Sequence, residues 1–432
     1  MQFLKRRDSV PALKWIARAI LSILLVSLVF ASEPVAQGPV PRHADGQVDV
    51  QHFAVVVNAL TRPASGITTS LSLINLAEPN ERRAVENEVI PLGNVPSDIL
   101  IRGHLAYIPN VYSDNILIIN LQRRAIIGEI PIRAGAQPQS LAVVNENKMY
   151  VTCDAAHEVH VVDIPNRNVT KVITGSFNKP TGITLLNGKA YVTNPAWEWD
   201  AEARQVLYHD SSVTVIDTTT DTVLKSIPMP TNAGGIVNNG ESTVIVKTTG
   251  DFRLISGNLV FIDTTTDEVR KTVNLKMTPG SFAISAEKQL FIQGGGQTPG
   301  LLIYDVVTEK WIRDKDDALV DFGGGSGMTF APDGSLYITY PDWTGGGQDE
   351  VRVMGTDETL LKTYRVGPGA DNVAIAQIIS RPEDINDDGF VNIFDLTIVS
   401  RYFGETGPDI LGDVNADGVV NVLDLVLIAN SL

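Results

Sequence analysis

A sequence unit recurs seven times between Phe53 and Ile379, and it leaves few folds open to this chain. Each copy opens with a short run of proline, glycine, alanine or small polar residues that leads into an apolar residue. The copies start at positions 96, 138, 180, 233, 279, 325 and 370, at intervals of 42, 42, 53, 46, 46 and 45 residues. Such a period predicts a repeat architecture in which each copy is one supersecondary unit.

Each unit contains apolar stretches with the length and composition of strands. A second strand follows the opening triplet, as in AYIPN at 106, MYVTC at 149 and AYVTN at 190. A third and a fourth come next, as in SVTVIDT at 212 and TVLKSIPM at 222. Runs rich in β-branched and aromatic residues between turns favour strands. Four strands per unit at this period predict an all-β fold, a seven-bladed β-propeller with four antiparallel strands in each blade.

The two ends of the repeat region are incomplete in complementary ways. The last opening strand, Val373 to Ile379, has no second strand after it, whereas FAVVVNA at 53 and SLSLINL at 70 have no opening strand before them. We expect the N- and C-terminal strands to form one blade, with the C-terminal strand innermost, so that no open edge remains. An open solenoid is the alternative, but it needs capping segments that the sequence does not contain.

Two motifs within the units resemble a known repeat. AYVTN at 190, together with VTVIDTTTD at 213 and VFIDTTTD at 260, is similar to the propeller repeats named after the Tyr-Val-Thr-Asn signature. The resemblance implies a fold more than a function, because that architecture carries binding proteins, lyases and quinone- or haem-dependent dehydrogenases alike.

A twelve-residue loop occurs twice in the last fifty residues, twenty-nine positions apart. Each copy has the pattern D-x-N-x-D-G and ends on an acid, which suits calcium, a hard cation that takes roughly six to eight oxygen ligands. A solvated Asn/Asp turn would explain one such loop, but not two in register. We expect two calcium ions, with ligands from loop positions 1, 3, 5, 7, 9 and 12: Asp384, Asn386, Asp388, Phe390, Asn392 and Asp395, then Asp413, Asn415, Asp417, Val419, Asn421 and Asp424.

The apolar spacing becomes helical after each loop, at Leu396, Val399 and Phe403, and again at Leu425, Ile428 and Leu432. These paired loop-helix units resemble a type I dockerin, with Asp at position 12 and no helix before either loop. The resemblance implies that the module docks a secreted protein onto a cohesin-type domain. It also implies that loop positions 10 and 11 contact the cohesin, and these are Ile393-Phe394 and Val422-Leu423.

The chain begins with a basic stretch and an apolar run from Ala19 to Ala31, which predict a secretory signal over residues 1–31. Thirteen apolar-rich residues are short for a spanning helix of about 20, so we expect membrane contact only if the signal stays uncleaved. Residues 32–49 have the composition of a flexible lead-in to a propeller over 50–379 and a calcium-loop domain over 380–432. We expect a monomer that is extracellular or attached to the cell surface.

Charge and cysteine content argue against a nucleic-acid partner and exclude stabilisation by disulfides. The net charge of −16 argues against nucleic acid as a partner. Cys153 is the only cysteine, so no intrachain disulfide can form and stability must come from packing and metal.

Aromatic residues gather in the predicted loops between second and third strands. The longest of these loops, 195–211, carries Trp197, Trp199 and Tyr208, and Trp343 lies in the corresponding loop of a later unit. Aromatic side chains on such a rim suit a sugar ring or a peptide. The alternative is that they pack against the neighbouring blade.

Signatures of catalysis are missing, and we expect no catalytic residue. His157-Glu158-Val159-His160 has a spacing of three, which on a strand points the two histidines to opposite faces. The leading hypothesis is a secreted, non-catalytic propeller that presents a ligand-binding face. The alternative is a polysaccharide hydrolase or lyase with its active site at the propeller funnel, because dockerins most often accompany such enzymes.

Overall fold

The computed structural model describes residues 49–60, 68–295, 300–343, 349–380, 383–386, 391–407, 410–415 and 417–432. Val50–Ile378 form one compact unit and Ile379–Leu432 belong to a second, and each is described by itself. The predicted signal and nearly all of the lead-in lie outside the described residues, as do Asp388 and Phe390 of the first loop. None of the helices in the described ranges is long and apolar enough to cross a membrane.

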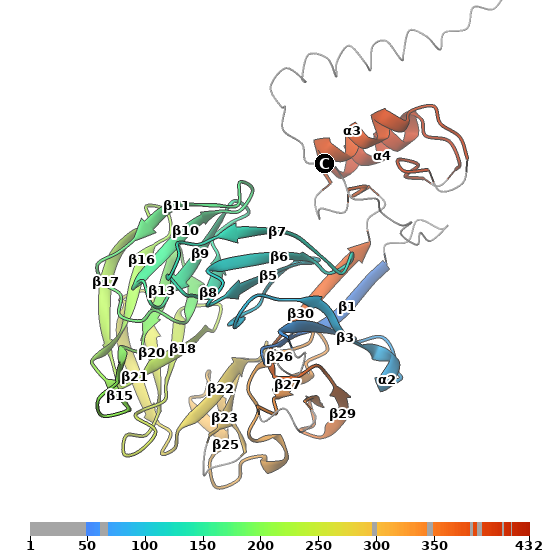
Figure 1. Ribbon diagram of the computed structural model, residues 1–432. Helices are drawn as coiled ribbons and strands as arrows, with labels where there is room; N and C mark the ends of the chain where they lie inside the picture. The colour runs from blue at the N-terminus through green and yellow to red at the C-terminus, as the bar shows by residue number, and fades with distance from the viewer. Residues whose placement is uncertain are drawn as a thin grey trace, which may run out of the picture. The chain divides into compact units, whose positions relative to one another are not determined.

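Seven four-stranded antiparallel sheets, the blades, surround a central axis (Figure 1). Six of them use four strands of one sequence unit, ordered from the inner to the outer edge. The first three are β4 (Leu100–Arg102), β5 (Leu105–Asn110), β6 (Asn115–Asn120) and β7 (Ala125–Pro131); β8 (Pro138–Val143), β9 (Lys148–Cys153), β10 (Glu158–Asp163) and β11 (Asn168–Ile173); and β12 (Ile183–Leu186), β13 (Lys189–Asn194), β16 (Ser211–Asp217) and β17 (Thr222–Met229).

The next three blades follow the same order. They are β18 (Ala233–Asn238), β19 (Thr243–Thr248), β20 (Asn258–Asp263) and β21 (Glu268–Asn274); β22 (Pro279–Ile284), β23 (Gln289–Gly294), β24 (Leu301–Asp305) and β25 (Lys310–Arg313); and β26 (Met328–Phe330), β27 (Leu336–Tyr340), β28 (Glu350–Met354) and β29 (Leu360–Arg365). A short 3-10 helix, η3 (Val320–Phe322), precedes the last of them.

The seventh blade joins the two ends of the propeller, which confirms the predicted closure. Its order is β3 (Val85–Pro91), β2 (Ser70–Asn75), β1 (Asp49–Asn58) and β30 (Ala370–Ser380), with the C-terminal strand innermost. Figure 1 shows β1 and β30 side by side. A four-residue helix, α2 (Glu81–Ala84), precedes β3, and the sequence pattern did not predict it.

The core is divided into layers between neighbouring blades. Seven clusters of buried residues lie at the blade interfaces, and the mixed blade contributes to two of them. Val55 packs in a cluster with Ile108 of one neighbouring blade, and Val56 packs in a cluster with Val353 of the other. Cys153 is buried in one of these layers, where it packs as a small apolar residue. The ring is therefore closed by packing as well as by strand pairing.

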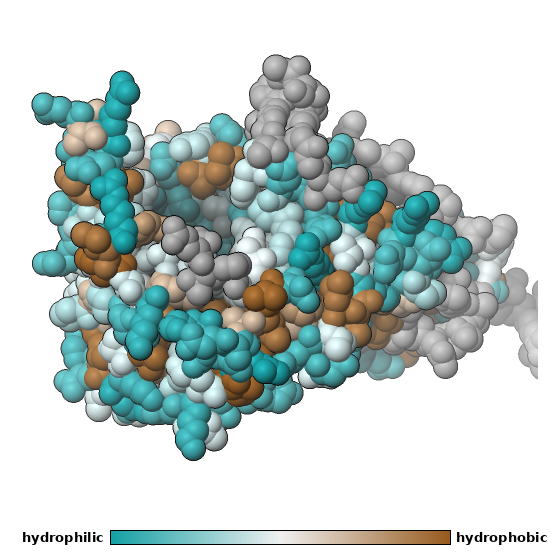
Figure 2. All heavy atoms as spheres, turned by 90° about the horizontal axis from the view of Figure 1, so that it is seen from below, coloured by the Kyte–Doolittle hydropathy of each residue, from teal (hydrophilic) through white to brown (hydrophobic). Residues whose placement is uncertain are grey.

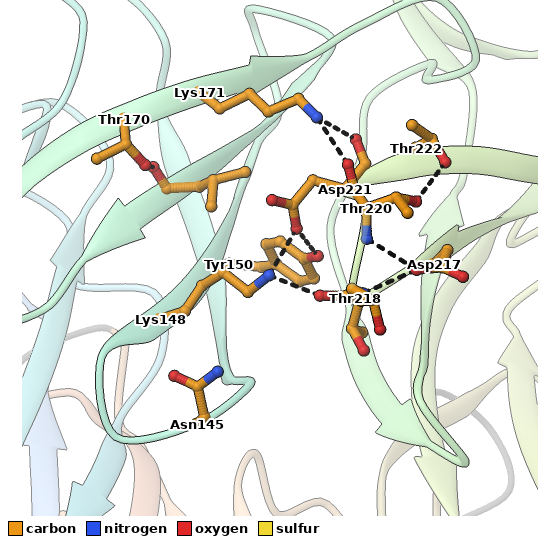
Figure 3. Close-up of polar contacts among 12 residues, drawn as sticks. Asn145, Lys148, Tyr150, Thr170, Lys171, Asp217, Thr218, Thr220, Asp221 and Thr222 are labelled. Atoms are coloured by element: carbon orange, nitrogen blue, oxygen red, sulfur yellow. Dashed lines mark hydrogen bonds and ion pairs between the residues drawn. The ribbon is translucent and has the colours of Figure 1, made fainter.

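Polar clamps also join adjacent blades, and Figure 3 shows one of them. Lys148 and Tyr150 on β9 both bind the carboxylate of Asp221, at the β16–β17 turn of the next blade; the Lys148 Nζ lies 2.9 Å from Asp221 Oδ1 and the Tyr150 hydroxyl donates to it. Burial, together with this bond, raises the pKa of Tyr150. Asp217 holds the same turn by accepting from the backbone N–H of Thr219 and Thr220.

The clamp is repeated one blade further on. Lys189 Nζ lies 2.7 Å from Asp267, and the Tyr191 hydroxyl donates to the same carboxylate at 2.6 Å. Asp221 and Asp267 are the last residues of the two DTTTD motifs. The motif therefore has two structural roles, since its first Asp shapes the turn and its last Asp binds the preceding blade.

The long loop at 195–211 is more regular than the sequence predicts. It forms a two-stranded hairpin of β14 (Trp197–Asp200) and β15 (Gln205–Tyr208), with Trp197 opposite Tyr208 and Trp199 opposite Val206. β14 alternates apolar and polar residues but β15 does not, and no residue of either strand is fully buried. A self-contained hairpin gives no burial pattern for a sequence argument to detect.

The C-terminal unit consists of two loops and two helices, as expected. The helices α3 (Ile393–Tyr402) and α4 (Val422–Ser431) each follow one loop. The core is small: the fully packed members are Ile385, Val399, Val414, Val420 and Ile428. Phe403 and Leu432 fall just past the ends of the helices, and Leu432 is exposed.

Candidate functional site

The acid at position 12 of each loop ties the start of the loop to the start of the helix. Asp424 Oδ1 accepts from the backbone N–H of Val414 and Asn415 at 2.7 and 3.2 Å, and its Oδ2 accepts from Asn421 at 2.7 Å. Asn421 in turn caps α4 by accepting from Leu423. Asp424 is completely buried. This reciprocal capping box fixes the helix N-terminus against the loop.

The first loop repeats this arrangement at the positions that the structure describes. Asp395 is completely buried and accepts from the backbone N–H of Ile385, Asn386 and Asn392 at 2.9, 3.1 and 2.8 Å. Asn392 caps α3 through Phe394. The two capping arrangements are therefore equivalent in structure as well as in sequence.

The interior of the second loop curls around its first acid. Asp413 accepts from the backbone N–H of Asp417 and Gly418, at 3.2 and 2.8 Å. Gly418 has φ +81, a conformation that favours glycine and that the sharp turn at position 6 requires. Asn415 Oδ1 accepts from Asp417 at 3.0 Å. Asp413 is almost fully buried in this turn.

The donor chemistry of the second loop fits calcium. Asp413, Asn415, Asp417, Asn421 and Asp424 offer side-chain oxygens and Val419 offers a carbonyl, and hard oxygen donors are what calcium takes. Backbone N–H groups engage these carboxylates here, and no three His, Cys, Asp or Glu side chains of the described residues are grouped to hold a metal. The fit therefore rests on the kind of donors in the loop and on its turn.

The pairs at loop positions 10 and 11 are the first residues of the two helices. Ile393 and Phe394 are 57% and 59% exposed, and Val422 and Leu423 are 51% and 54% exposed. The small core of this domain is filled by other residues, and none of these four side chains belongs to it. The module therefore presents two equivalent apolar pairs to solvent.

The rim aromatics divide into exposed and packed residues. Trp199 and Trp343 are 55% and 51% exposed. Trp197 is only partly exposed, because the Lys179 ammonium lies 4.4 Å from its ring centroid. Tyr208 is also partly buried, with its ring 6.5 Å from Phe252 in the next β19–β20 loop. The ligand and packing interpretations thus apply to different residues of one hairpin.

This division predicts different effects for two substitutions in the hairpin. Trp199→Ala is expected to change the free energy of unfolding by less than about 0.5 kcal/mol, because the ring is on the surface. Trp197→Ala is expected to cost about 1 kcal/mol or more, because it removes both partial burial and the Lys179 contact. Chemical denaturation of both variants checks this, and equal losses would contradict the division.

His157 and His160 make separate contacts. His157 Nδ1 accepts from the backbone N–H of Lys179 at 3.0 Å. His160 is buried, with Nε2 3.0 Å from Glu158, which also pairs with Arg133. His157 thus makes a local hydrogen bond at the surface, and His160 is part of the interior.

The mouth of the central funnel contains a belt of inter-blade hydrogen bonds that the sequence pattern did not reveal. The belt position is the fourth residue of each second-strand signature. In four blades its side chain donates to the backbone carbonyl of the second residue of the next blade's opening triplet, at Thr152, Thr193, Lys247 and Thr339. Gln293 donates instead to Phe322 O. Thr152 donates to Thr181 O at 2.6 Å, and Thr339 donates to Asp371 O at 2.6 Å. The signal was present as a recurrent threonine in MYVTC, AYVTN and LYITY, but only the ring geometry gives it a role.

Two carboxyl groups also lie at the funnel. Asp98 accepts from the backbone N–H of Ile99 and Leu141, and burial raises the pKa of its carboxyl. Burial likewise raises the pKa of Asp371, which bonds to Ser326 and to the Asn372 amide. Asn372 also donates to Ser97 O at 3.2 Å, which links the inner strands of the two blades that carry these acids.

The fold and the two sites define a seven-bladed β-propeller joined to a module of paired calcium-type loops. Residues 382–432 match the dockerin type I domain. Type I dockerin domains bind calcium, and they anchor extracellular proteins through cohesin domains. The carboxy-terminal module of this chain is therefore a dockerin that indicates cohesin-mediated anchoring of a propeller and a secreted protein.

Solved structures support the propeller fold. A protein of unknown function from Desulfotomaculum acetoxidans is 12% identical, with a TM-score of 0.55 over 75% of this chain and 98% of that one. The hydrazine synthase of Kuenenia stuttgartiensis is 18% identical, with a TM-score of 0.53 over 64% of this chain and 88% of that one. A quinoprotein alcohol dehydrogenase-like protein from Bacteroides thetaiotaomicron is 13% identical, with a TM-score of 0.53 over 75% and 77%. The comparison with curated proteins finds no match.

Proposed function

We propose that this chain is a secreted adaptor that docks onto a cohesin-bearing scaffold or surface through its dockerin and presents the propeller face to a carbohydrate or peptide ligand. The dockerin holds two calcium ions, one in each loop. The observation that carries the docking half is the pair of equivalent, exposed apolar contacts at Ile393-Phe394 and Val422-Leu423. Burying such side chains against a partner is favourable by about 1.5–3 kcal/mol each.

The equivalence of the two units predicts how docking responds to substitution. Replacing one pair, as in Ile393→Ser with Phe394→Ser, is expected to leave a complex of similar affinity, because the other pair can still contact a cohesin. Replacing both pairs is expected to weaken docking by about 10³-fold, since neither unit then offers its two apolar contacts, which are together worth about 3–6 kcal/mol. Surface plasmon resonance against a panel of cohesin domains in calcium measures this.

A matched control separates docking from general loss of apolar surface. Leu361→Ser removes a propeller leucine that is 54% exposed, the same fraction as Leu423, and should leave cohesin affinity unchanged. Docking that survives the double replacement would contradict the proposal.

The ligand half of the proposal is supported by the exposed rim aromatics. Four exposed aromatic residues lie between the second and third strands of their blades and so share one rim of the ring: Tyr112, Trp199, Phe252 and Trp343. On the face seen in Figure 2, polar side chains predominate and apolar ones form separate patches. Scattered aromatic platforms among polar groups suit a glycan or an extended peptide more than a large apolar partner.

A polysaccharide hydrolase or lyase is the second candidate, and one observation favours it. Asp98 and Asp371 lie at the funnel with raised pKa values, and a general acid needs a carboxyl group that keeps its proton. The 50–379 segment can be assayed on a polysaccharide panel. Activity that is lost in the Asp98→Asn variant would support a hydrolase or lyase over the adaptor.

A further inference from the structure

One member of the funnel belt is charged. The belt position lies at the same point of every second strand, one residue before the strand ends. Six of these side chains are neutral and one is a lysine. The set is Val57, Pro109, Thr152, Thr193, Lys247, Gln293 and Thr339.

Glycines make room for this lysine at the inner strand. Lys247 lies opposite Gly235 of β18, the innermost strand of its blade. A Cβ on Gly235 would fall 2.9 Å from Lys247 Cε and 2.8 Å from Phe282 Cε1, so any other residue would displace the lysine. A Cβ on Gly234 would meet nothing within 4 Å, which shows that the space beside this strand is open.

The ammonium group reaches the next blade, where it finds neutral partners. Lys247 Nζ donates to Gly280 O, the belt acceptor, and lies 5.5 Å from the centroid of the Phe282 ring. The hydroxyl of Ser281, the residue after Gly280, is buried without a hydrogen-bond partner in the described structure. One carbonyl leaves the ammonium with donors to spare, because an ammonium has three.

Three other partly buried lysines of the propeller have carboxylate partners. Lys148, Lys189 and Lys271 pair with Asp221, Asp267 and Glu309 at 2.9, 2.7 and 2.9 Å. No carboxylate among the described residues pairs with Lys247. Withdrawing a charged group from water costs free energy unless the group is paired. The presence of a lysine at this position therefore points to an anion that is supplied from outside the chain.

The charge distribution of the funnel agrees with this assignment. Burial without a counter-ion lowers the pKa of Lys247 to about 8, so the group is still mostly protonated at neutral pH. The two acids at the funnel, Asp98 and Asp371, belong to adjacent blades. The blade that carries Lys247 lies three blades from that of Asp98 in one direction around the ring and three blades from that of Asp371 in the other. A negatively charged ligand group therefore has one favourable side of the funnel.

We propose that the propeller funnel binds a carboxylate-bearing ligand, with the carboxylate on the Lys247 ammonium and the adjoining chain over Gly234, Gly235 and Phe282. The chemistry is that of an organic carboxylate, either free or carried on an acidic sugar such as a uronic acid. This site rests on the ligand-presenting half of the proposed function and is independent of cohesin docking. It also defines the chemical class of the ligand, an organic carboxylate, which the proposed function leaves open.

Calorimetric titration of the full chain tests the site with three probes: trigalacturonate, its methyl ester and succinate. Wild-type protein is expected to bind trigalacturonate, and Lys247→Met to bind it about tenfold or more weakly, because a charged hydrogen-bonded contact is lost. Lys276→Met, which removes an exposed lysine, should change affinity by less than about twofold since its charge is screened. Thermal unfolding of each variant controls for folding.

The outcomes are distinct. Binding of trigalacturonate but not of the ester or of succinate assigns an acidic-sugar site, and equal binding of succinate assigns a free-carboxylate site. Equal binding to wild type and to Lys247→Met overturns the proposal. The proposal is also overturned if neither trigalacturonate nor succinate binds at about 10 mM. Cohesin binding by the same samples tests docking separately, and Lys247→Met should retain it.

Discussion

Deletion of Asp371–Ile379 is expected to cause aggregation, without forming a stable six-bladed ring. The deleted segment is most of β30, the innermost strand of the mixed blade. Val373, Ala376 and Ile378 are buried in the two layers on either side of this blade. At about 1.5–3 kcal/mol for a large buried apolar side chain, their loss approaches the total stability of a typical domain, about 5–15 kcal/mol.

The exposed edge explains why aggregation should follow. Without β30, the inner edge of β1 presents unpaired backbone groups to solvent, and such an edge pairs readily with another chain. Size-exclusion chromatography with light scattering, and the width of the thermal transition, measure the change. The matched control is a chain that ends at Ser380, which keeps β30 and lacks the dockerin, and it should stay monomeric with an unchanged propeller transition. A soluble, cooperatively folded deletion variant would show that the closure is dispensable.

Much of this architecture could be predicted because the sequence units recur at a nearly regular interval. The opening triplets, the second strands and the complementary ends together predict seven blades and the mixed closure, and the pairing of β1 with β30 confirms both. The strand TVLKSIPM at 222 is found as β17 with the same bounds. Strands buried on both faces leave a strong signal in one sequence, because each apolar run is bounded by turns.

Contacts between units were harder to foresee. Lys148 and Asp221 are 73 residues apart, and neither strand pattern nor turn pattern says that they meet. The belt at the funnel was missed for the same reason, since Lys247 stands in an ordinary strand signature, VIVKT, and only its position opposite Gly235 makes it unusual. Local periodicity predicts elements, whereas a site assembled across blades needs the ring.

Calcium is expected to fold the dockerin and thereby to create its docking surface. The argument begins from the size of the core, in which five side chains are fully packed: Ile385, Val399, Val414, Val420 and Ile428. Below about 70 residues such a domain usually needs a metal or a cross-link, and the one cysteine of this chain lies in the propeller. Metal binding energy then becomes folding energy.

The loops show why the metal-free state should be unstable. Asp413 and Asp424 are nearly or completely buried, and both belong to one twelve-residue loop that also contains Asp417. Their backbone N–H partners offset part of the cost of burying these charges, but like charges in one loop still repel. A bound divalent cation would neutralise them, and Asp424 would then hold both the loop start and the N-terminus of α4 in place.

The expected result is that isolated 380–432 gains helix when calcium is added and loses it with a chelator, as measured by circular dichroism. Asp384→Ala with Asp413→Ala should abolish the gain. Because Asp413 also accepts backbone hydrogen bonds, Asp384→Asn with Asp413→Asn is the matched control; it keeps an acceptor oxygen and should move the transition to higher calcium without removing it. In the full chain, chelation should abolish cohesin binding while the propeller transition stays in place, since the propeller forms its own compact unit. Equal helicity with and without calcium would show that this core suffices alone, and the exposed pairs Ile393-Phe394 and Val422-Leu423 would then be presented independently of the metal.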